Sequence, residues 1–338
     1  MNLKKIRIII IGFGRWGQMW FQNLKKDSNY EIVGIVCRHP NKIENINIKK
    51  SNIPKSLFFT SLEEAIKKAN ADAVLLVVPP EKHFSIAMQC MKAGLHILSE
   101  KPLAVNMKEA IILSQTARQY NRHFMISQDY RWQPPIKTLR SIISSGTIGK
   151  IGYINYNHFQ ALRRGGWREQ MKHVLLEDMS IHHFDILRYI TDKDCLNVYD
   201  DSYNPIWSWY TGGASVSAIL TFKEEFRVCY FGTWVTTGRA NSWPGELRIE
   251  GENGSLSLTA DNKVILFKDG FEQEMPLDAM EHCGRDYALN LFKKYVIEGI
   301  LPETNIYDNI KSFAIVQAAL ESSRLHKTVN TVEMLAVS

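Results

Sequence analysis

The 338-residue sequence lacks a long hydrophobic segment and any close pair of cysteines. The isoleucine run at 8–11 is far shorter than the roughly 20 apolar residues of a membrane-spanning helix, and no other segment comes nearer. The five cysteines, Cys37, Cys90, Cys195, Cys229 and Cys283, are odd in number and form no CxxC pair. This pattern suggests neither a disulfide framework nor a thiolate zinc site. We therefore expect a globular protein of the reducing cytoplasm with no membrane partner.

Acidic residues are scarce in the first part of the chain. Residues 1–127 hold 9 Asp and Glu against 19 Lys and Arg, whereas the remainder holds 26 against 22. A positive first part suits a polyanionic ligand such as a dinucleotide, although a solvated basic surface explains the same imbalance. Because the basic residues are dispersed rather than gathered along a recognition motif, we do not expect nucleic acid as a partner.

The first 127 residues alternate short apolar runs with amphipathic stretches, as βαβ units around a parallel sheet do. Ser61 has the chemistry of a helix N-cap, and Gly94 that of the residue that follows a helix. Strands are expected at 6–11, 31–37, 73–78, 96–99 and 124–127, and helices at 16–26, 61–69, 84–93 and 107–120.

The pattern changes after residue 127. Segments rich in β-branched and aromatic residues, separated by turn residues, predict a mostly antiparallel sheet. Strands are expected at 151–159, 213–222, 227–236, 246–250 and 255–259, and helices at 134–144, 179–190, 286–298 and 308–326. No flexible linker separates the two parts. The sequence thus predicts an α/β protein, with a doubly wound parallel sheet in domain 1–127 and an α+β domain at 128–338.

A GxGxxG motif, Gly12-Phe13-Gly14-Arg15-Trp16-Gly17, lies between the first predicted strand and the first predicted helix. The first glycine allows a tight turn, the second lets backbone approach a pyrophosphate, and the third allows close packing of helix on strand. The helix N-terminus adds free N–H donors and a favourable dipole. This context predicts a Rossmann dinucleotide site. A glycine-rich structural turn is the alternative.

The second predicted strand is not followed by an acidic residue. An Asp or Glu there would bind the ribose 2′-hydroxyl and select NAD. Arg38 follows the strand instead, and its planar guanidinium can pair with a 2′-phosphate. The sequence therefore favours NADP over NAD. In the alternative, Arg38 stacks on the adenine, which either cofactor allows.

The tripeptide Glu100-Lys101-Pro102 follows the predicted strand 96–99. Because the carboxyl ends of parallel strands line the ligand crevice, we expect Lys101 where nicotinamide and substrate meet. Pro102 can take a cis bond that fixes the turn. Taken alone, such a tripeptide is also a common surface turn.

Asp178, His182 and Asp185 recur with spacing i, i+4, i+7, which aligns them on one stripe of a helix. The rest of that helix is apolar, so it is expected to be buried, and polar groups there must be paired or face a cavity. A histidine beside a carboxylate can move a hydroxyl proton. The alternatives are a structural histidine capped by two carboxylates, and a metal site formed by Asp178, His182 and His183. We expect no metal, because the sequence places no third good ligand.

A glycine-containing loop, Arg163-Arg164-Gly165-Gly166-Trp167-Arg168, precedes this helix. Its Trp and Arg side chains could cover a nicotinamide or sugar ring. An exposed aromatic and basic loop explains the same residues equally well.

Together these motifs resemble the Gfo/Idh/MocA family, named for glucose–fructose oxidoreductase, inositol dehydrogenase and a rhizopine-catabolism protein. The resemblance covers nearly the whole chain, and it rests on 12–17, 100–102, 128–149 with Tyr130-Arg131-Trp132, 178–185 and 302–329. One stretch departs from it, because residues 173–177 read His-Val-Leu-Leu-Glu where many members are rich in glycine. The substrate therefore stays open.

The resemblance implies an NAD(P)-dependent enzyme that transfers a hydride to or from a carbinol or carbonyl carbon of a sugar, sugar derivative or cyclitol. Lys101 would polarise the reacting oxygen, His182 would act as acid and base, and Asp178 would orient His182. Substrate contacts are implied for Lys101, Tyr130, Arg131, Asp178 and His182. Cofactor contacts are implied for Gly12, Phe13, Gly14, Arg15, Trp16, Gly17, Cys37, Arg38, Pro79, His83, Glu100, Lys101, Trp167 and Arg168.

The resemblance also implies an open antiparallel sheet in the second domain, through which the chain forms a homodimer or homotetramer. A non-catalytic dinucleotide-binding sensor or regulator of the same fold is the alternative function. The presence of both Lys101 and His182 speaks against that alternative.

Overall fold

The computed structural model describes residues 5–37, 53–163 and 165–336. The chain forms two compact units. The first comprises Met1–Ser127 and Arg285–Asn309, and the second comprises Gln128–Gly284 and Ile310–Ser338. Within the described ranges, no helix is long and apolar enough to cross a membrane.

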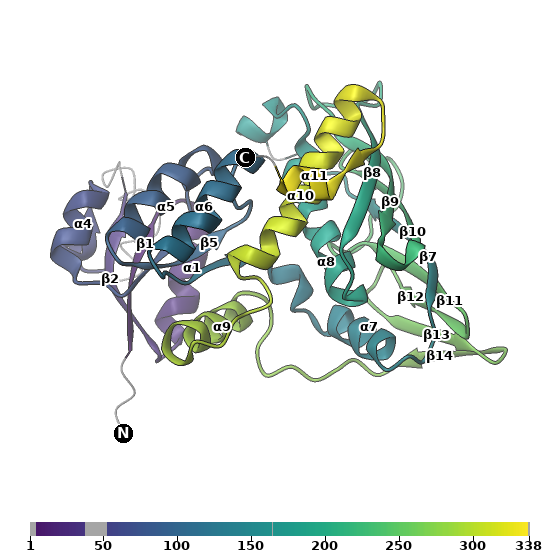
Figure 1. Cartoon of the computed structure of the whole chain (residues 1–338), viewed down its shortest axis with the longest axis horizontal. Coiled ribbons are helices and arrows are strands. Elements are labelled where there is room, and N and C mark those ends of the chain that lie inside the picture. The colour runs from purple at the N-terminus through teal and green to yellow at the C-terminus, as the bar shows by residue number, and fades with distance from the viewer. Residues whose placement is uncertain (1–4, 38–52, 164, 337–338) are drawn as a thin grey trace. The chain divides into compact units, whose positions relative to one another are not determined.

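The first unit is built on a parallel six-stranded sheet in the order β3-β2-β1-β4-β5-β6. Helices α4, α5 and α6 lie together on one side of this sheet, with α1 on the other (Figure 1). This arrangement confirms the predicted doubly wound fold, to which the structure adds the short β3. The strands are β1 (Ile6–Ile11), β2 (Tyr30–Val36), β3 (Phe58–Phe59), β4 (Ala73–Leu76), β5 (His96–Glu100) and β6 (Phe124–Ser127), and the helices are α1 (Arg15–Lys26), α4 (Leu62–Ala69), α5 (His83–Lys92) and α6 (Met107–Gln119).

Local sequence signals set the helix ends in this unit. The Ser61 hydroxyl caps α4 by accepting the Glu64 N–H at 3.4 Å. After α5, Gly94 takes a positive φ of 82°, and its N–H donates to the Met91 carbonyl at 3.0 Å. Both ends follow the capping residues that the sequence indicates.

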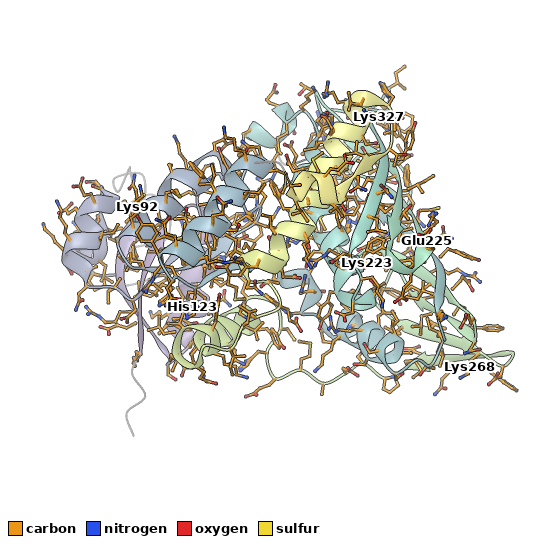
Figure 2. All side chains as sticks on the ribbon, viewed as in Figure 1. Lys92, His123, Lys223, Glu225, Lys268 and Lys327 are labelled. Atoms are coloured by element: carbon orange, nitrogen blue, oxygen red, sulfur yellow. The ribbon has the colours of Figure 1, made fainter. Side chains whose placement is uncertain are left out.

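Residues 285–309 belong to the first unit, although the predicted second domain included them. Helix α9 (Gly284–Glu298) explains this difference through its contacts. The Tyr30 hydroxyl donates to the Leu289 carbonyl at 2.6 Å, and the Asn23 amide donates to Asp286 at 2.7 Å. Figure 2 shows His123 beside α9, where its ring centroid lies 4.0 Å from that of Tyr295. The chain therefore returns to the first sheet after building most of the second.

The second unit is built on a nine-stranded sheet in the order β14-β13-β12-β11-β7-β10-β9-β8-β15. Among the described strands of this second sheet, only the β7–β10 pair is parallel, which confirms the predicted mostly antiparallel sheet. Strands β8, β13, β14 and β15 were not predicted. The strands are β7 (Ile151–Phe159), β8 (Cys195–Tyr203), β9 (Ser215–Phe222), β10 (Arg227–Thr233), β11 (Glu246–Gly251), β12 (Gly254–Leu258), β13 (Val264–Lys268), β14 (Phe271–Met275) and β15 (Val329–Asn330).

The two faces of this sheet differ in burial. On the inner face, Tyr156, Tyr230 and Ala218 are register partners on three neighbouring strands, and all are buried. Helix α8 (Ile181–Thr191) covers this face, with the Phe184 ring centroid 5.1 Å from that of Tyr230. The outer face carries exposed side chains, among them Tyr199 and Ile219, which pair across β8 and β9. The remaining helices are α7 (Pro134–Ser144), α10 (Ile306–Leu325) and α11 (Thr331–Leu335).

Candidate active site

The glycine loop between β1 and α1 requires glycine at two positions for steric reasons. Gly12 has φ of 97°, and a Cβ atom there would lie 2.2 Å from the Val77 carbonyl oxygen. A Cβ atom on Gly17 would lie 2.2 Å from the Gly12 carbonyl oxygen. The first glycine thus permits the close approach of β1 to the end of β4, and the last permits α1 to pack on the turn.

The N-terminus of α1 presents backbone N–H donors that no side chain caps. Gly14 is the N-cap residue, no side chain caps the helix, and the first turn has no acidic residue. Among the described residues, and apart from its chain neighbours and the adjoining helix backbone, no heavy atom lies within 4 Å of the place where a Gly14 Cβ would be. Free amides and an uncompensated helix dipole suit a phosphate group. The loop therefore fits the pyrophosphate of a dinucleotide, as the sequence predicts.

The other loop side chains have distinct surroundings. Phe13 is buried, with its ring 5.8 Å from that of Phe21, so only its backbone can meet a ligand. Arg15 is exposed, and Trp16 is partly exposed beneath the Arg285 guanidinium, which lies 4.7 Å from the ring centroid. These contacts lie at the start of α1, beside the phosphate-binding backbone.

The ribose-reading position is described only in part. The Cys37 N–H at the end of β2 donates to the Phe59 carbonyl at 2.9 Å, and the thiol is free and partly buried. Arg38 lies outside the described residues. Pro79 is the N-cap residue of a short 3-10 turn, Pro80–Lys82, that follows β4.

The Lys101 turn follows β5 directly. The Glu100 carboxylate accepts a hydrogen bond from the Trp20 indole N–H at 2.7 Å, and the Lys101–Pro102 peptide bond is cis. His83 is 1% exposed, and its ring nitrogens lie 2.8 Å from the Pro102 carbonyl oxygen and 3.0 Å from that of Val78. Burial lowers the pKa of His83. His83 thus contacts backbone inside the first unit.

In the second unit, α8 is buried along its whole length, as its apolar pattern predicts. His182 lies in its first turn with 6% of its surface exposed, and the Tyr130 ring meets it edge-on at a centroid distance of 4.5 Å. Asp178 lies just before α8, in a π-helical turn over Leu176–Ser180. Such turns are frequent at functional sites, because the widened helix alters where its side chains lie.

The Asp178 carboxylate forms an ion pair with Arg168. The Arg168 Nε donates to Asp178 Oδ2 at 2.6 Å, and the two side chains are 20% and 13% exposed. The Arg168 guanidinium also lies 4.4 Å from the ring centroid of Trp167, which is largely exposed. The ion pair therefore attaches the Trp167-Arg168 loop to the Asp178 turn within the second unit.

Asp185 binds a different cation. Arg131 donates through Nε to Asp185 Oδ2 at 2.7 Å and through a second nitrogen to Oδ1, and the Ser312 hydroxyl donates to Oδ1 at 2.8 Å. Both charged side chains are buried, and the Arg131 guanidinium also lies over the Tyr189 ring. Buried charges need such complete pairing. The Arg131 side chain thus binds Asp185 inside the second unit, and the substrate contact that the resemblance implies for it stays a prediction.

His183 anchors α8 to the sheet through a directed chain of hydrogen bonds, which sequence reasoning missed. Its Nε2 lies 3.0 Å from the Trp243 carbonyl, which only accepts, so Nε2 carries the proton. Burial lowers the pKa of His183 to about 4, so Nδ1 is unprotonated at neutral pH and accepts from the Tyr230 hydroxyl at 2.9 Å. The Ser180 hydroxyl then donates to Tyr230 at 2.9 Å. The inward position of Tyr230 in an alternating strand was the available sequence signal.

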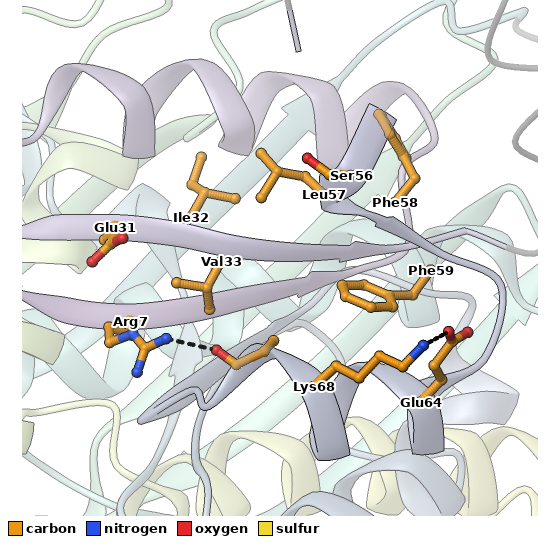
Figure 3. A pocket seen from close by; sticks show the side chains of 11 residues that line it. Arg7, Glu31, Ile32, Val33, Ser56, Leu57, Phe58, Phe59, Glu64 and Lys68 are labelled. Carbon is orange, nitrogen blue, oxygen red and sulfur yellow. Dashed lines mark hydrogen bonds and ion pairs between the residues drawn. The ribbon is translucent and has the colours of Figure 1, made fainter. Parts of the chain in front are cut away.

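Among the described residues, neither a metal-binding group nor a hollow gives additional site residues. Across residues 5–37, 53–163 and 165–336, no three His, Cys, Asp or Glu side chains form a group that could hold a metal ion. A hollow of about 580 Å³ lies at the β2 edge, between β3 and α4, where Lys68 pairs with Glu64 (Figure 3). None of the described candidate residues lines it.

Comparison with known proteins gives matches in both parts of the chain. A family model described as the oxidoreductase family, NAD-binding Rossmann fold, matches residues 6–128, and one described as the GFO/IDH/MocA C-terminal domain matches residues 136–257. The uncharacterized protein y4oX of Sinorhizobium fredii is 26% identical over 353 aligned residues, which cover 99% of this chain and 97% of that protein. Myo-inositol 2-dehydrogenase of Thermotoga maritima is 25% identical over 196 residues, which are 58% of each chain.

A solved structure shares the complete fold. The oxidoreductase from Agrobacterium radiobacter, crystallised in complex with NAD+, L-tartaric acid and magnesium, superposes with a TM-score of 0.88. The superposition covers 98% of this chain and 100% of that one at 18% sequence identity, and it shows that the two share a fold. With both family models matched in the expected order, the chain belongs to the Gfo/Idh/MocA family and is an NAD(P)-dependent oxidoreductase.

Proposed function

We propose that this enzyme transfers a hydride between a nicotinamide dinucleotide and a carbinol or carbonyl carbon of a sugar, sugar derivative or cyclitol. The observation that carries the proposal is the placement of Lys101 at the carboxyl end of β5. In the same sheet, β1 ends at the glycine loop, and β4 lies between these two strands. An amine at this edge of a doubly wound sheet lies where such folds bind their ligands.

The chemistry needs one group to move a proton and another to stabilise charge on oxygen. A bound nicotinamide supplies the hydride acceptor or donor. In the oxidation direction, the neutral His182 imidazole takes the hydroxyl proton, and the Lys101 ammonium donates a hydrogen bond to the oxygen as its negative charge develops. In the reduction direction, His182 returns the proton. Asp178, with Arg168 as its partner, orients this site, and Tyr130 restricts the His182 ring from one side.

The substrate class draws on both a relative and the local structure. One matched relative is named for myo-inositol, a cyclitol, which supports a polyhydroxylated ring. The stretch before Asp178 carries buried Leu175 and Leu176, and His173 lies 3.1 Å from the Ser202 hydroxyl. Bulky side chains therefore stand where the sequence resemblance would place glycines, which favours a substrate other than free inositol itself.

Nicotinamide absorbance measured against a panel of cyclitols, aldoses, keto-sugars and sugar acids tests this function. We expect turnover with at least one polyhydroxylated ring compound and with either NADP(H) or NAD(H). A wild-type protein that binds the dinucleotide tightly but turns over no member of the panel in either direction would instead support the non-catalytic sensor.

We further propose NADP as the preferred cofactor, with Arg38 as the side chain that reads the 2′-phosphate. Charge-assisted hydrogen bonds of this kind contribute about 1.5–3 kcal/mol, or roughly 10- to 100-fold in affinity. Arg38→Ala is therefore expected to weaken the binding of NADPH by that factor and the binding of NADH by much less, as measured by fluorescence titration. Lys92→Ala, a change in an exposed lysine at the end of α5, is the control. Equal losses for the two cofactors would mean that Arg38 only stacks.

We propose that identical chains assemble through the outer face of the nine-stranded sheet. Tyr199, Ile219 and Phe267 expose 43%, 51% and 48% of their surfaces on this face, an apolar content that suits an interface between identical sheets. We expect a dimer or tetramer by light scattering, and a smaller species for Ile219→Glu. Ile297→Glu, at an equally exposed isoleucine of α9, should keep the wild-type mass. A monomeric wild type, or equal masses for both variants, would contradict this proposal.

A further inference from the structure

We propose that Trp20 and His83 are positioning residues that fix the backbone of Lys101 relative to the glycine loop. The inference rests on the proposed function, since it gives these two side chains a task in the same reaction. Neither side chain needs to touch the substrate for this task. Each connects one flank of the Lys101 turn to a segment beside the phosphate-binding backbone.

The first connection runs from α1 to Glu100. Trp20 lies three residues after Gly17, is fully buried, and donates its indole N–H to Glu100 Oε1 at 2.7 Å. An N–H that donates to a carboxylate forms a strong, directional bond. The Arg285 guanidinium lies 5.7 Å from the Trp20 ring centroid and adds a cation–π contact. The helix that opens at the glycine loop therefore holds the residue before Lys101.

The second connection runs from the end of β4 to Pro102. The ring nitrogens of His83 lie 2.8 Å from the Pro102 carbonyl oxygen and 3.0 Å from the Val78 carbonyl oxygen. The neighbouring Val77 donates its N–H to the Ile11 carbonyl at 2.8 Å, directly before Gly12. A neutral ring donates to one of the two carbonyls and an imidazolium to both. The imidazolium thus bridges the two segments by hydrogen bonds, whereas the neutral ring, which burial favours, hydrogen-bonds one carbonyl and packs between the two segments.

Together the two bridges hold Glu100 and Pro102, the residues on either side of Lys101. A lysine side chain has four rotatable methylene bonds, so its ammonium explores a wide volume unless its backbone is fixed. Both bridges end on segments that frame Gly12 and Gly17, and close packing at those two glycines leaves little freedom there. The glycine loop that binds the cofactor phosphates therefore also fixes the position of the Lys101 backbone, from which the side chain extends. Misplacement by about 1 Å can lower turnover roughly 100-fold.

Trp20→Phe tests the first bridge, because it keeps an aromatic ring at this position and removes the N–H. We expect kcat to fall roughly 10- to 100-fold while the dinucleotide Kd changes less than about threefold. Trp20→His, which restores an N–H donor, should recover part of the loss. The control is Trp207→Phe, which removes an indole donor to the Val235 carbonyl in the second unit. If Trp20→Phe keeps the wild-type kcat, or if Trp20→His recovers none of the loss although both variants keep the wild-type melting temperature, the first bridge plays no positioning part.

The second bridge is tested by a pair of variants. His83→Phe should lower kcat by a similar factor, and His83→Gln, which keeps one donor, should lower it less. Equal loss in the two variants at wild-type melting temperature would contradict the bridge.

A readout without substrate separates this inference from the proposed function. The acylation rate of each lysine by a succinimidyl ester is measured by mass spectrometry on the folded full-length chain. We expect the Lys101 rate to change severalfold in Trp20→Phe and His83→Gln, while Lys108, an exposed lysine in α6, keeps its rate. An unchanged Lys101 rate in both variants overturns the positioning roles even if the enzyme is active. Conversely, a wild type without turnover refutes the function while the lysine rates still test the positioning.

Discussion

Lys101→Met is expected to lower kcat by about 10²–10³-fold while leaving the dinucleotide Kd nearly unchanged. The substitution keeps an unbranched side chain only one atom shorter, next to the end of β5, but it removes the only proton donors that the side chain offers. Donors aimed at a developing oxyanion contribute on this scale because they act mainly in the transition state. The measurement is steady-state nicotinamide absorbance, with cofactor binding followed separately by fluorescence.

Two further variants make this prediction specific. Lys101→Arg keeps the charge but spreads it over a planar fork of different reach, so it should recover only part of the rate. Lys108→Met removes a matched, exposed lysine from α6 and should behave as wild type. If Lys101→Met retains a kcat within a few fold of wild type, the amine does not serve the reaction and the proposed mechanism fails.

The sequence predicted the first unit in most of its elements, because buried parallel strands and capped helices leave strong local signals. It predicted the second sheet less completely. Strands β13 and β14 were missed although Asp269-Gly270 joins them with φ of 52° and 81°, the conformation of a tight hairpin turn. In β14 the residues of both faces are largely exposed, and in β13 only Val264 is buried, so the alternation that marks a half-buried strand is weak there.

Periodicity also predicted α9, but not the sheet against which it packs. An amphipathic pattern shows that one face is buried without showing against which sheet. The contacts that place α9 in the first unit join residues far apart in the chain, as between Tyr30 and Leu289. Such pairings leave no local signal in the sequence. The assignment of residues 285–309 to the first unit could therefore be seen only in the structure.

The candidate residues show the same limit. The family resemblance identified Glu100, His83 and Arg131 as candidates, but not the groups they bind. Glu100 accepts from a side chain 80 positions earlier, and Arg131 pairs with a carboxylate 54 positions later. Chemistry-bearing residues can therefore be found from short patterns, whereas the distinction between a group that meets a ligand and one that holds the fold needs the three-dimensional contacts.

His182→Gln is the second large effect, and it separates a catalytic imidazole from a structural one. We expect kcat/KM to fall about 10²–10⁴-fold, the range over which a positioned acid or base contributes. The neutral ring acts as the base, so activity in the oxidation direction should fall at low pH in the wild type. Glutamine cannot take up the hydroxyl proton, so this acidic limb should be absent from the variant's residual activity.

The control is His282→Gln, an exposed histidine of the second unit, which should keep both the rate and the pH profile. A purely structural His182 would give the opposite pattern, because the ring is buried and packs edge-on against Tyr130. In that case His182→Gln would lower the melting temperature and leave the pH profile of the remaining folded enzyme unchanged. Since the acidic limb reports protonation rather than folding, its loss in a variant with wild-type stability can arise only if the imidazole itself exchanges the proton.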